Sequence, residues 1–113
     1  MQVTVVETPT YLVRASKVMT SAEMNSVVDF VSRTPEAGDV IKGSRGLRKT
    51  RVALAGRGKS GGARVIYWYY NEGFPAVLLW AFAKNETENI TKSQLATLAK
   101  YAEALRTDFR RLK

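Results

Sequence analysis

The pattern of apolar and polar positions begins with a short strand and a helix. QVTVV (2–6) is rich in β-branched residues, which is typical of a strand. Thr8 and Pro9 then place an N-cap residue before a proline at the first helical position, a combination that opens helices. We therefore expect a strand at 2–6 followed by a short helix that ends near Ser16.

A second helix is expected after a capping box. The Thr20 hydroxyl can accept a hydrogen bond from the backbone N–H of Glu23, and the Glu23 carboxylate can reach back to the N-cap backbone. Residues 36–46 contain three glycines and predict a loop, so this helix should end near Arg33. Its apolar residues recur at helical spacing: Met24, Val27, Val28 and Val31.

Three strands are expected in the middle of the chain. LRKTRVAL (47–54) alternates, so its residues divide between two faces. The face that carries Lys49 and Arg51 cannot line a core, because unpaired cations are costly to bury. ARVIYWYYN (63–71) is rich in aromatic and β-branched residues. The continuously apolar AVLLWAFAK (76–84) predicts a central strand that is covered on both faces.

The chain closes with an amphipathic helix. Thr91 and Gln94 form another capping box. The order of strand, two helices, three antiparallel strands and helix predicts one α+β domain over 1–113. We expect a small, mostly antiparallel twisted sheet flanked by the N-terminal helices and the C-terminal helix. The apolar stripe of that last helix is Leu95, Leu98, Ala99, Ala102, Leu105, Phe109 and Leu112.

Positive charge is concentrated in the middle of the chain. The sequence carries 18 Lys and Arg against 10 Asp and Glu, a formal net charge of +8. No acidic residue lies between Asp39 and Glu72, and a stretch with one sign of charge indicates a surface for a polyanion. The cations of this stretch are Lys42, Arg45, Arg48, Lys49, Arg51, Arg57, Lys59 and Arg64.

The composition excludes several kinds of chemistry and location. The sequence has no cysteine for a disulfide or thiolate, and no histidine, the commonest general base and metal ligand. We therefore expect neither a metal site nor a cofactor. The N-terminus lacks the features of a signal peptide, and the longest apolar run (76–83) is far shorter than the ~20 residues that span a bilayer. A soluble cytoplasmic protein without a membrane partner is expected.

The segment 53–60 fits the loose phosphate-loop pattern through Ala53, Gly58, Lys59 and Ser60. A phosphate loop joins a strand to a helix, whereas a strand is expected after this segment. We therefore expect no nucleotide cofactor. The glycines are consistent with a loop whose backbone approaches a partner, with Arg57 and Lys59 on it, or with a merely solvated connection.

Three motifs, in order, resemble the HigB branch of the RelE/ParE toxin superfamily, the toxins of bacterial toxin–antitoxin pairs. They are GDVIKGSRGLRKTRVA (38–53), GRGKSGGARVIYWYY (56–70) and FAKNETENIT (82–91). The resemblance implies a RelE-like fold that enters the ribosomal A site and cuts messenger RNA during translation. It also implies a cognate HigA-like antitoxin that neutralises the toxin, with the ribosome and messenger RNA as further partners.

The resemblance also implies site residues. Arg64 matches the arginine that contacts the scissile phosphate, and Lys49 and Arg51 match a cationic pair on the preceding strand. Lys84 occupies the position of the basic residue that ends the third strand. The catalytic set is thus Lys49, Arg51, Arg64 and Lys84. The basic stretch described above supplies most of the expected RNA- or ribosome-binding set, which is Arg45, Arg48, Arg57, Lys59 and Asn85.

The chain departs from the family pattern at three positions. Arg45 stands where a glycine is expected, which could alter the contacts with RNA. Asn85 stands where several RelE proteins have an arginine, and its role is open. Phe82 replaces an expected tyrosine, so a hydroxyl that could take part in the reaction is missing.

RNA cleavage without histidine requires other proton carriers. Neighbouring cations disfavour the charged form of a lysine, so Lys49 beside Arg51 suits a general base. Arg51 and Arg64 are permanently charged and suit stabilisation of the phosphorane. Lys84 could clamp a phosphate or act as the acid, and the roles of the two lysines stay interchangeable at this point.

Two other functions remain open from the sequence. The first keeps the fold and replaces cleavage with ParE-like inhibition of DNA gyrase, although the four candidate catalytic residues disfavour it. The second is a non-catalytic basic module, in which the same cations hold phosphate backbones only.

Overall fold

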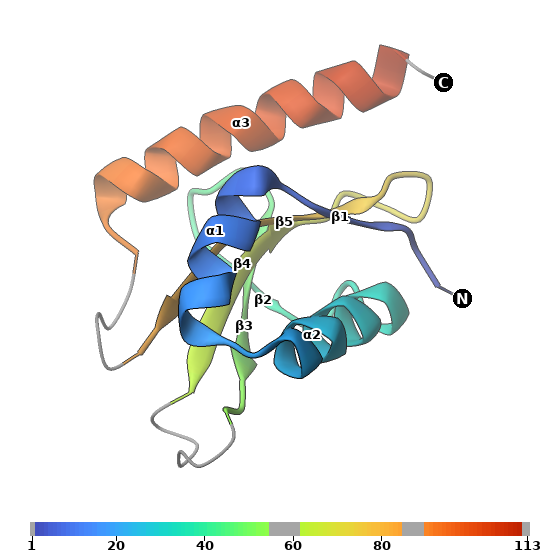
Figure 1. The fold of residues 1–113 in the computed structure, drawn as a ribbon. Coiled ribbons are helices and arrows are strands. Elements are labelled where there is room, and N and C mark those ends of the chain that lie inside the picture. The colour runs from blue at the N-terminus through green and yellow to red at the C-terminus, as the bar shows by residue number, and fades with distance from the viewer. Residues whose placement is uncertain (1, 55–61, 85–89, 112–113) are drawn as a thin grey trace.

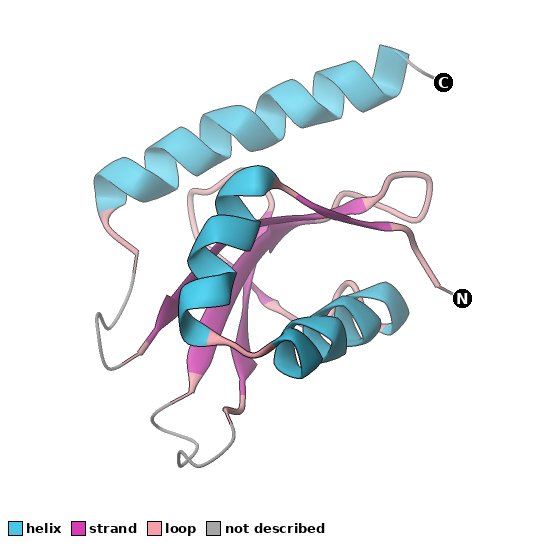
Figure 2. Cartoon of the chain, in the orientation of Figure 1, coloured by secondary structure: helices cyan, strands magenta, loops and turns pink. Residues whose placement is uncertain are grey.

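The computed structural model describes residues 2–54, 62–84 and 90–111 (Figure 1). These residues form helices packed against a twisted sheet (Figures 1 and 2), which confirms the expected α+β fold. The helices are α1 (Pro9–Val18), α2 (Ser21–Arg33) and α3 (Lys92–Arg111). The strands are β1 (Val5–Glu7), β2 (Asp39–Val40), β3 (Leu47–Val52), β4 (Ala63–Trp68) and β5 (Ala76–Ala83).

The described strands form one sheet in the order β1-β5-β4-β3-β2. The pairs among β2, β3, β4 and β5 are antiparallel, whereas β1 runs parallel to β5. Several expected bounds were wrong in detail. The predicted loop 36–46 contains the two-residue edge strand β2, and α1 continues past Ser16 to Val18. The first strand spans Val5–Glu7 rather than 2–6. The strands expected at 47–54, 63–71 and 76–84 end earlier, at Val52, Trp68 and Ala83.

The sheet buries a different core on each face. On one face, α1 and α2 pack through Tyr11, Ala15, Val27 and Val31 against residues of β4 and β5 such as Val65. On the other face, α3 covers residues that include Leu47, Ile66, Trp68, Leu79 and Phe82. The expected apolar stripe of α3 is confirmed for Leu95, Leu98, Ala99, Ala102, Leu105 and Phe109, and Leu112 lies outside the described residues.

A β-bulge interrupts the pairing of β4 with β5. Ile66 pairs with Trp80, but the next residue, Tyr67, pairs with Leu78. Leu79 is therefore the extra residue, and both Leu79 and Trp80 pack on the α3 side of the sheet.

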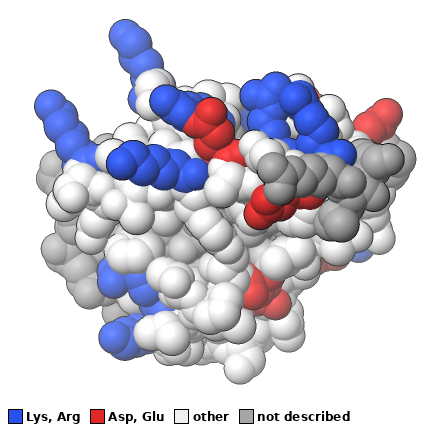
Figure 3. All heavy atoms as spheres, turned by 90° about the horizontal axis from the view of Figure 1, so that it is seen from above, with Lys and Arg blue, Asp and Glu red and all other residues white. Residues whose placement is uncertain are grey.

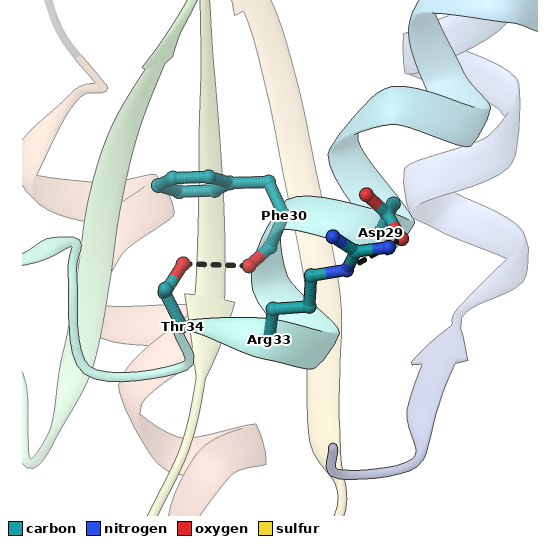
Figure 4. Close-up of polar contacts among 4 residues, drawn as sticks. All are labelled: Asp29, Phe30, Arg33 and Thr34. Atoms are coloured by element: carbon teal, nitrogen blue, oxygen red, sulfur yellow. Dashed lines mark hydrogen bonds and ion pairs between the residues drawn. The ribbon is translucent and has the colours of Figure 1, made fainter. Parts of the chain in front are cut away.

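All the predicted helix caps are present. Thr8 accepts a hydrogen bond from the Tyr11 backbone, and Thr20 and Glu23 form the complete capping box. At the end of α2, the Thr34 hydroxyl donates to the Phe30 carbonyl (2.7 Å) and Arg33 pairs with Asp29 (3.1 Å; Figure 4). The hydrogen bonds at the two N-caps satisfy backbone N–H groups that the start of a helix would otherwise leave without partners.

Candidate functional site

Two arginines face each other across β3 and β4. Arg51 on β3 pairs directly with Arg64 on β4, which in turn pairs with Phe82 on β5. Alternation along β3 places Lys49 on the same face as Arg51. Like charges opposite each other destabilise a sheet, so this arrangement costs the fold stability.

Lys84 joins the same end of the sheet. Its backbone N–H donates to the Gly62 carbonyl (3.0 Å), so strand pairing continues one residue beyond β5. Alternation then puts Lys84 on the face of Phe82 and Arg64. The structure thus brings together all four residues of the predicted catalytic set, which we call the cationic cluster: Lys49, Arg51, Arg64 and Lys84.

Arg64 is the buried member of the cationic cluster, with 6% of its surface exposed. Its Nη1 donates to the Ala63 carbonyl (3.1 Å), and no carboxylate of the described residues forms an ion pair with it. Burial, and to a smaller extent the charge of Arg51, lowers the pKa of Arg64. A buried cation without an acidic partner is a site prepared for an anion from outside.

Arg48 lies apart from the cationic cluster, on the opposite face of β3. Its Nη1 donates to the carbonyls of Glu36 (2.8 Å) and Gly38 (2.9 Å). Tyr67 secures the same loop, because its hydroxyl donates to the Pro35 carbonyl (2.7 Å) and accepts from the Gly38 N–H (3.0 Å). Arg48 therefore holds the loop between α2 and β2, and the structure does not bring it to the cluster.

Arg45 lies at the other end of the sheet. It precedes Leu47, which pairs with Trp68, four residues along β4 from Arg64 and thus about 13 Å away. Arg45 has a left-handed backbone (φ 61°) and forms an ion pair with Glu103 of α3. The other three predicted binding residues, Arg57, Lys59 and Asn85, lie outside the described residues.

The surface over α3 is mixed in charge. Lysine and arginine side chains lie there among acidic ones (Figure 3), and the helix exposes Glu103 and Asp108 beside Lys100, Arg106 and Arg110. The strands β3 and β4 carry cations and no acidic residue, whereas the surface over α3 carries both signs of charge.

Arg14 of α1 is a further candidate that was not predicted from the sequence. Its Nε donates to the Ala81 carbonyl (2.9 Å), and its guanidinium lies over the Trp80 ring, 4.1 Å from the ring centre. The helical spacing held a signal, since Arg14 lies three residues after buried Tyr11 and one before buried Ala15.

Neither a metal-binding group nor a membrane-spanning helix occurs within the described residues. No group of three or more acidic, histidine or cysteine side chains in these ranges could hold a metal ion. No helix among them is long and apolar enough to cross a membrane.

Comparisons with known proteins identify the family and agree with the fold. A family described as the RelE toxin of the RelE/RelB toxin–antitoxin system matches residues 15–111. The solved structure of an arginine-to-alanine double mutant of the E. coli toxin RelE in the free state is similar, with a TM-score of 0.56 and 16% sequence identity. The match covers 78% of this chain and 90% of that chain, and at this identity it shows the fold alone.

Proposed function

Because the chain belongs to the family of RelE toxins of RelE/RelB toxin–antitoxin systems, we propose that it is a metal-independent endoribonuclease that cuts messenger RNA in the ribosomal A site. The cleavage would inhibit translation in the cytoplasm. In this proposal the chain is a HigB-type toxin, and a HigA-like antitoxin neutralises it.

The observation that carries the proposal is the buried Arg64 opposite Arg51. Two arginines in register repel each other, and within the described residues Arg64 has no acidic partner. A phosphodiester supplies the missing negative charge and accepts bidentate hydrogen bonds from guanidinium groups. The charge increases in the phosphorane, so both arginines stabilise the transition state more than the bound substrate.

The chemistry balances with the residues at hand. The ribose 2′-oxygen forms a bond to phosphorus while the bond from phosphorus to the 5′-oxygen breaks, which leaves a 2′,3′-cyclic phosphate and a 5′-hydroxyl. One group must take the proton of the 2′-hydroxyl, and another must protonate the leaving 5′-oxygen. Lys49 and Lys84 flank Arg64 and are our candidates for these two roles, in either order.

The ribosome would supply the alignment that the toxin lacks. A basic protein binds RNA anywhere through its phosphates, and such binding does not fix one linkage for attack. The A site presents messenger RNA in one conformation, so the toxin needs only to add the charged groups.

The antitoxin would act by charge as well as by fit. We expect it to cover or displace part of the cationic cluster with acidic residues. Complex formation should then weaken as salt rises, and a salt-independent affinity would contradict this part of the proposal.

The test is induced expression with mapping of messenger 5′ ends. The unmodified protein should produce new 5′-hydroxyl ends during translation, and Arg64→Ala should lower the cleavage rate by about 10²–10³-fold. Arg33→Ala removes an exposed arginine of α2 that pairs with Asp29, and it should cleave as the parent does. If Arg64→Ala inhibits growth as strongly as the parent at equal expression, the nuclease proposal is refuted. Loss of DNA supercoiling without messenger cleavage would instead favour gyrase inhibition.

A further inference from the structure

The far part of β5 has an open edge that a side chain of α1 occupies. The parallel strand β1 pairs with β5 only as far as Leu78. Helix α1 lies along β5 (Figure 1) and supplies partners beyond that point. The Thr8 hydroxyl donates to the Leu78 carbonyl (2.8 Å), and Arg14 Nε donates to the Ala81 carbonyl (2.9 Å).

The attachment point of Arg14 lies beside the cationic cluster. Ala81 pairs with Val65, next to the pair of Phe82 with Arg64. Neighbouring strands are about 4.8 Å apart, so a group that takes the place of the next strand beyond β5 lies about 10 Å from β4. The Trp80 ring under the guanidinium packs on the α3 side of the sheet, the side that also carries Arg64.

Arg14 has donors to spare and a fixed position. An arginine has five N–H donors, and the hydrogen bond to Ala81 uses only one of them. No carboxylate of the described residues pairs with Arg14. The stacking on Trp80 and the backbone bond hold the planar group in place, so little conformational entropy is lost when it binds an anion.

We propose that Arg14, supported by Trp80, binds a second phosphate of the RNA strand, next to the phosphate held by Arg64. The inference rests on the proposed function for the identity of the strand. The strand then crosses β4 and β5 with one arginine at each phosphate. Arg14 is a binding residue in this scheme and takes no part in proton transfer.

The test measures how the affinity for RNA depends on salt. The probe is a single-stranded 2′-O-methyl oligoribonucleotide, which cannot be cleaved because its 2′-hydroxyl is blocked. For single strands, each phosphate contact contributes about 0.7 to the slope of log K against log salt concentration. Arg14→Gln should lower the magnitude of the slope by about 0.7, whereas Arg14→Lys, which keeps the charge, should keep the slope.

Arg33→Gln is the matched control, because it makes the same exchange on α2. The Ser32 carbonyl next to it accepts from Val3, which places this end of α2 beside the N-terminus rather than the cationic cluster. Its slope should equal that of the parent. A slope of Arg14→Gln equal to that of Arg33→Gln would overturn the proposal.

A second measurement needs no variant and covers the case in which Arg14→Gln does not fold. The Nε–H signal of Arg14 in an NMR titration with the same oligonucleotide should shift, while that of Arg33 stays in place. An unmoved Arg14 signal overturns the inference. Because neither readout involves cleavage, a protein that binds the oligonucleotide through Arg14 but never cuts messenger RNA would refute the nuclease proposal and leave this contact established.

Discussion

At the scale of single residues, Arg64 is where the stability of the fold conflicts with the role that we propose for it. It is buried, it faces another arginine, and within the described residues its guanidinium donates a hydrogen bond only to the Ala63 carbonyl. The sequence predicted the grouping, since alternation along LRKTRV and the position of Arg64 in GGARV placed three cations on neighbouring strands. It did not predict the burial, because burial depends on which distant parts of the chain pack around Arg64 in the fold.

Replacing Arg64 with methionine should raise the free energy of unfolding and abolish the proposed cleavage of RNA. The change removes the repulsion by Arg51 and the cost of burying a charge, and methionine fills much of the same space. We expect the free energy of unfolding to rise by about 1 kcal/mol, measured by urea denaturation. Arg51→Met removes an exposed charge, which costs less to keep in the fold, so the free energy of unfolding should rise by less. A large loss of stability in Arg64→Met would contradict this prediction, because it would show that the Arg64 guanidinium stabilises the fold.

Gly38 lies so close to the Tyr67 side chain that there is no room for a larger residue. A Cβ atom at this position would lie 2.7 Å from the Tyr67 hydroxyl oxygen, and Tyr67 is fully buried with both its hydrogen bonds made. Gly38→Ala should therefore lower the free energy of unfolding by about 1–3 kcal/mol. Ala37→Gly changes an exposed neighbour and should lower the free energy of unfolding by much less. Thermal melts of the two variants and the parent measure the difference.

At the scale of elements, the sequence predicted most of what local signals control. The caps at Thr8, Thr20 and Thr91 fixed the starts of the helices, and the alternation of β3 assigned its faces. The parallel pairing of β1 with β5 has no local signal, because residues 5 and 76 are far apart in the chain. Likewise, AVLLWAFA is apolar on both faces, so its pattern could not show the bulge at Leu79.

An aromatic cluster holds the C-terminal half of helix α3 against the rest of the protein. The Phe109 ring stacks on Trp68 (6.1 Å between ring centres) and lies edge-on to Phe74 (6.4 Å). Phe109→Ala should cost about 2 kcal/mol, less than for a fully buried ring, because Phe109 is half-buried. Hydrogen exchange should accelerate in the last turns of α3 and stay slow in β4. Thr107→Ala, on the exposed side of the helix, should leave the exchange pattern unchanged.

At the scale of the whole molecule, buried tyrosines limit stability in alkali. Burial raises the pKa of Tyr11, and the charge of Glu7 raises it further. Burial also raises the pKa values of Tyr67 and Tyr69. These residues ionise near pH 10 in the unfolded chain but keep their protons in the folded protein. The unfolded state thus binds fewer protons above about pH 10, and stability must fall as the pH rises.

Tyr11→Phe separates this effect from the titration of lysines. The Tyr11 hydroxyl is buried and has no hydrogen-bond partner in the described structure, so its removal should stabilise the protein by about 1 kcal/mol at pH 7. Stability curves between pH 9 and about 11 should also fall less steeply for the variant. Parallel curves for parent and variant would show that Tyr11 ionises normally.

The extra residue at position 79 changes the phase of β5 halfway along its length. Before it, Val77 and Leu79 point to α3; after it, Trp80 and Phe82 do, and Lys84 follows them. Without the insertion, the small side chains of Ala81 and Ala83 would occupy that surface. One unpaired amino acid therefore decides whether the surface beside Arg64 is built from alanines or from two aromatic rings and an amine.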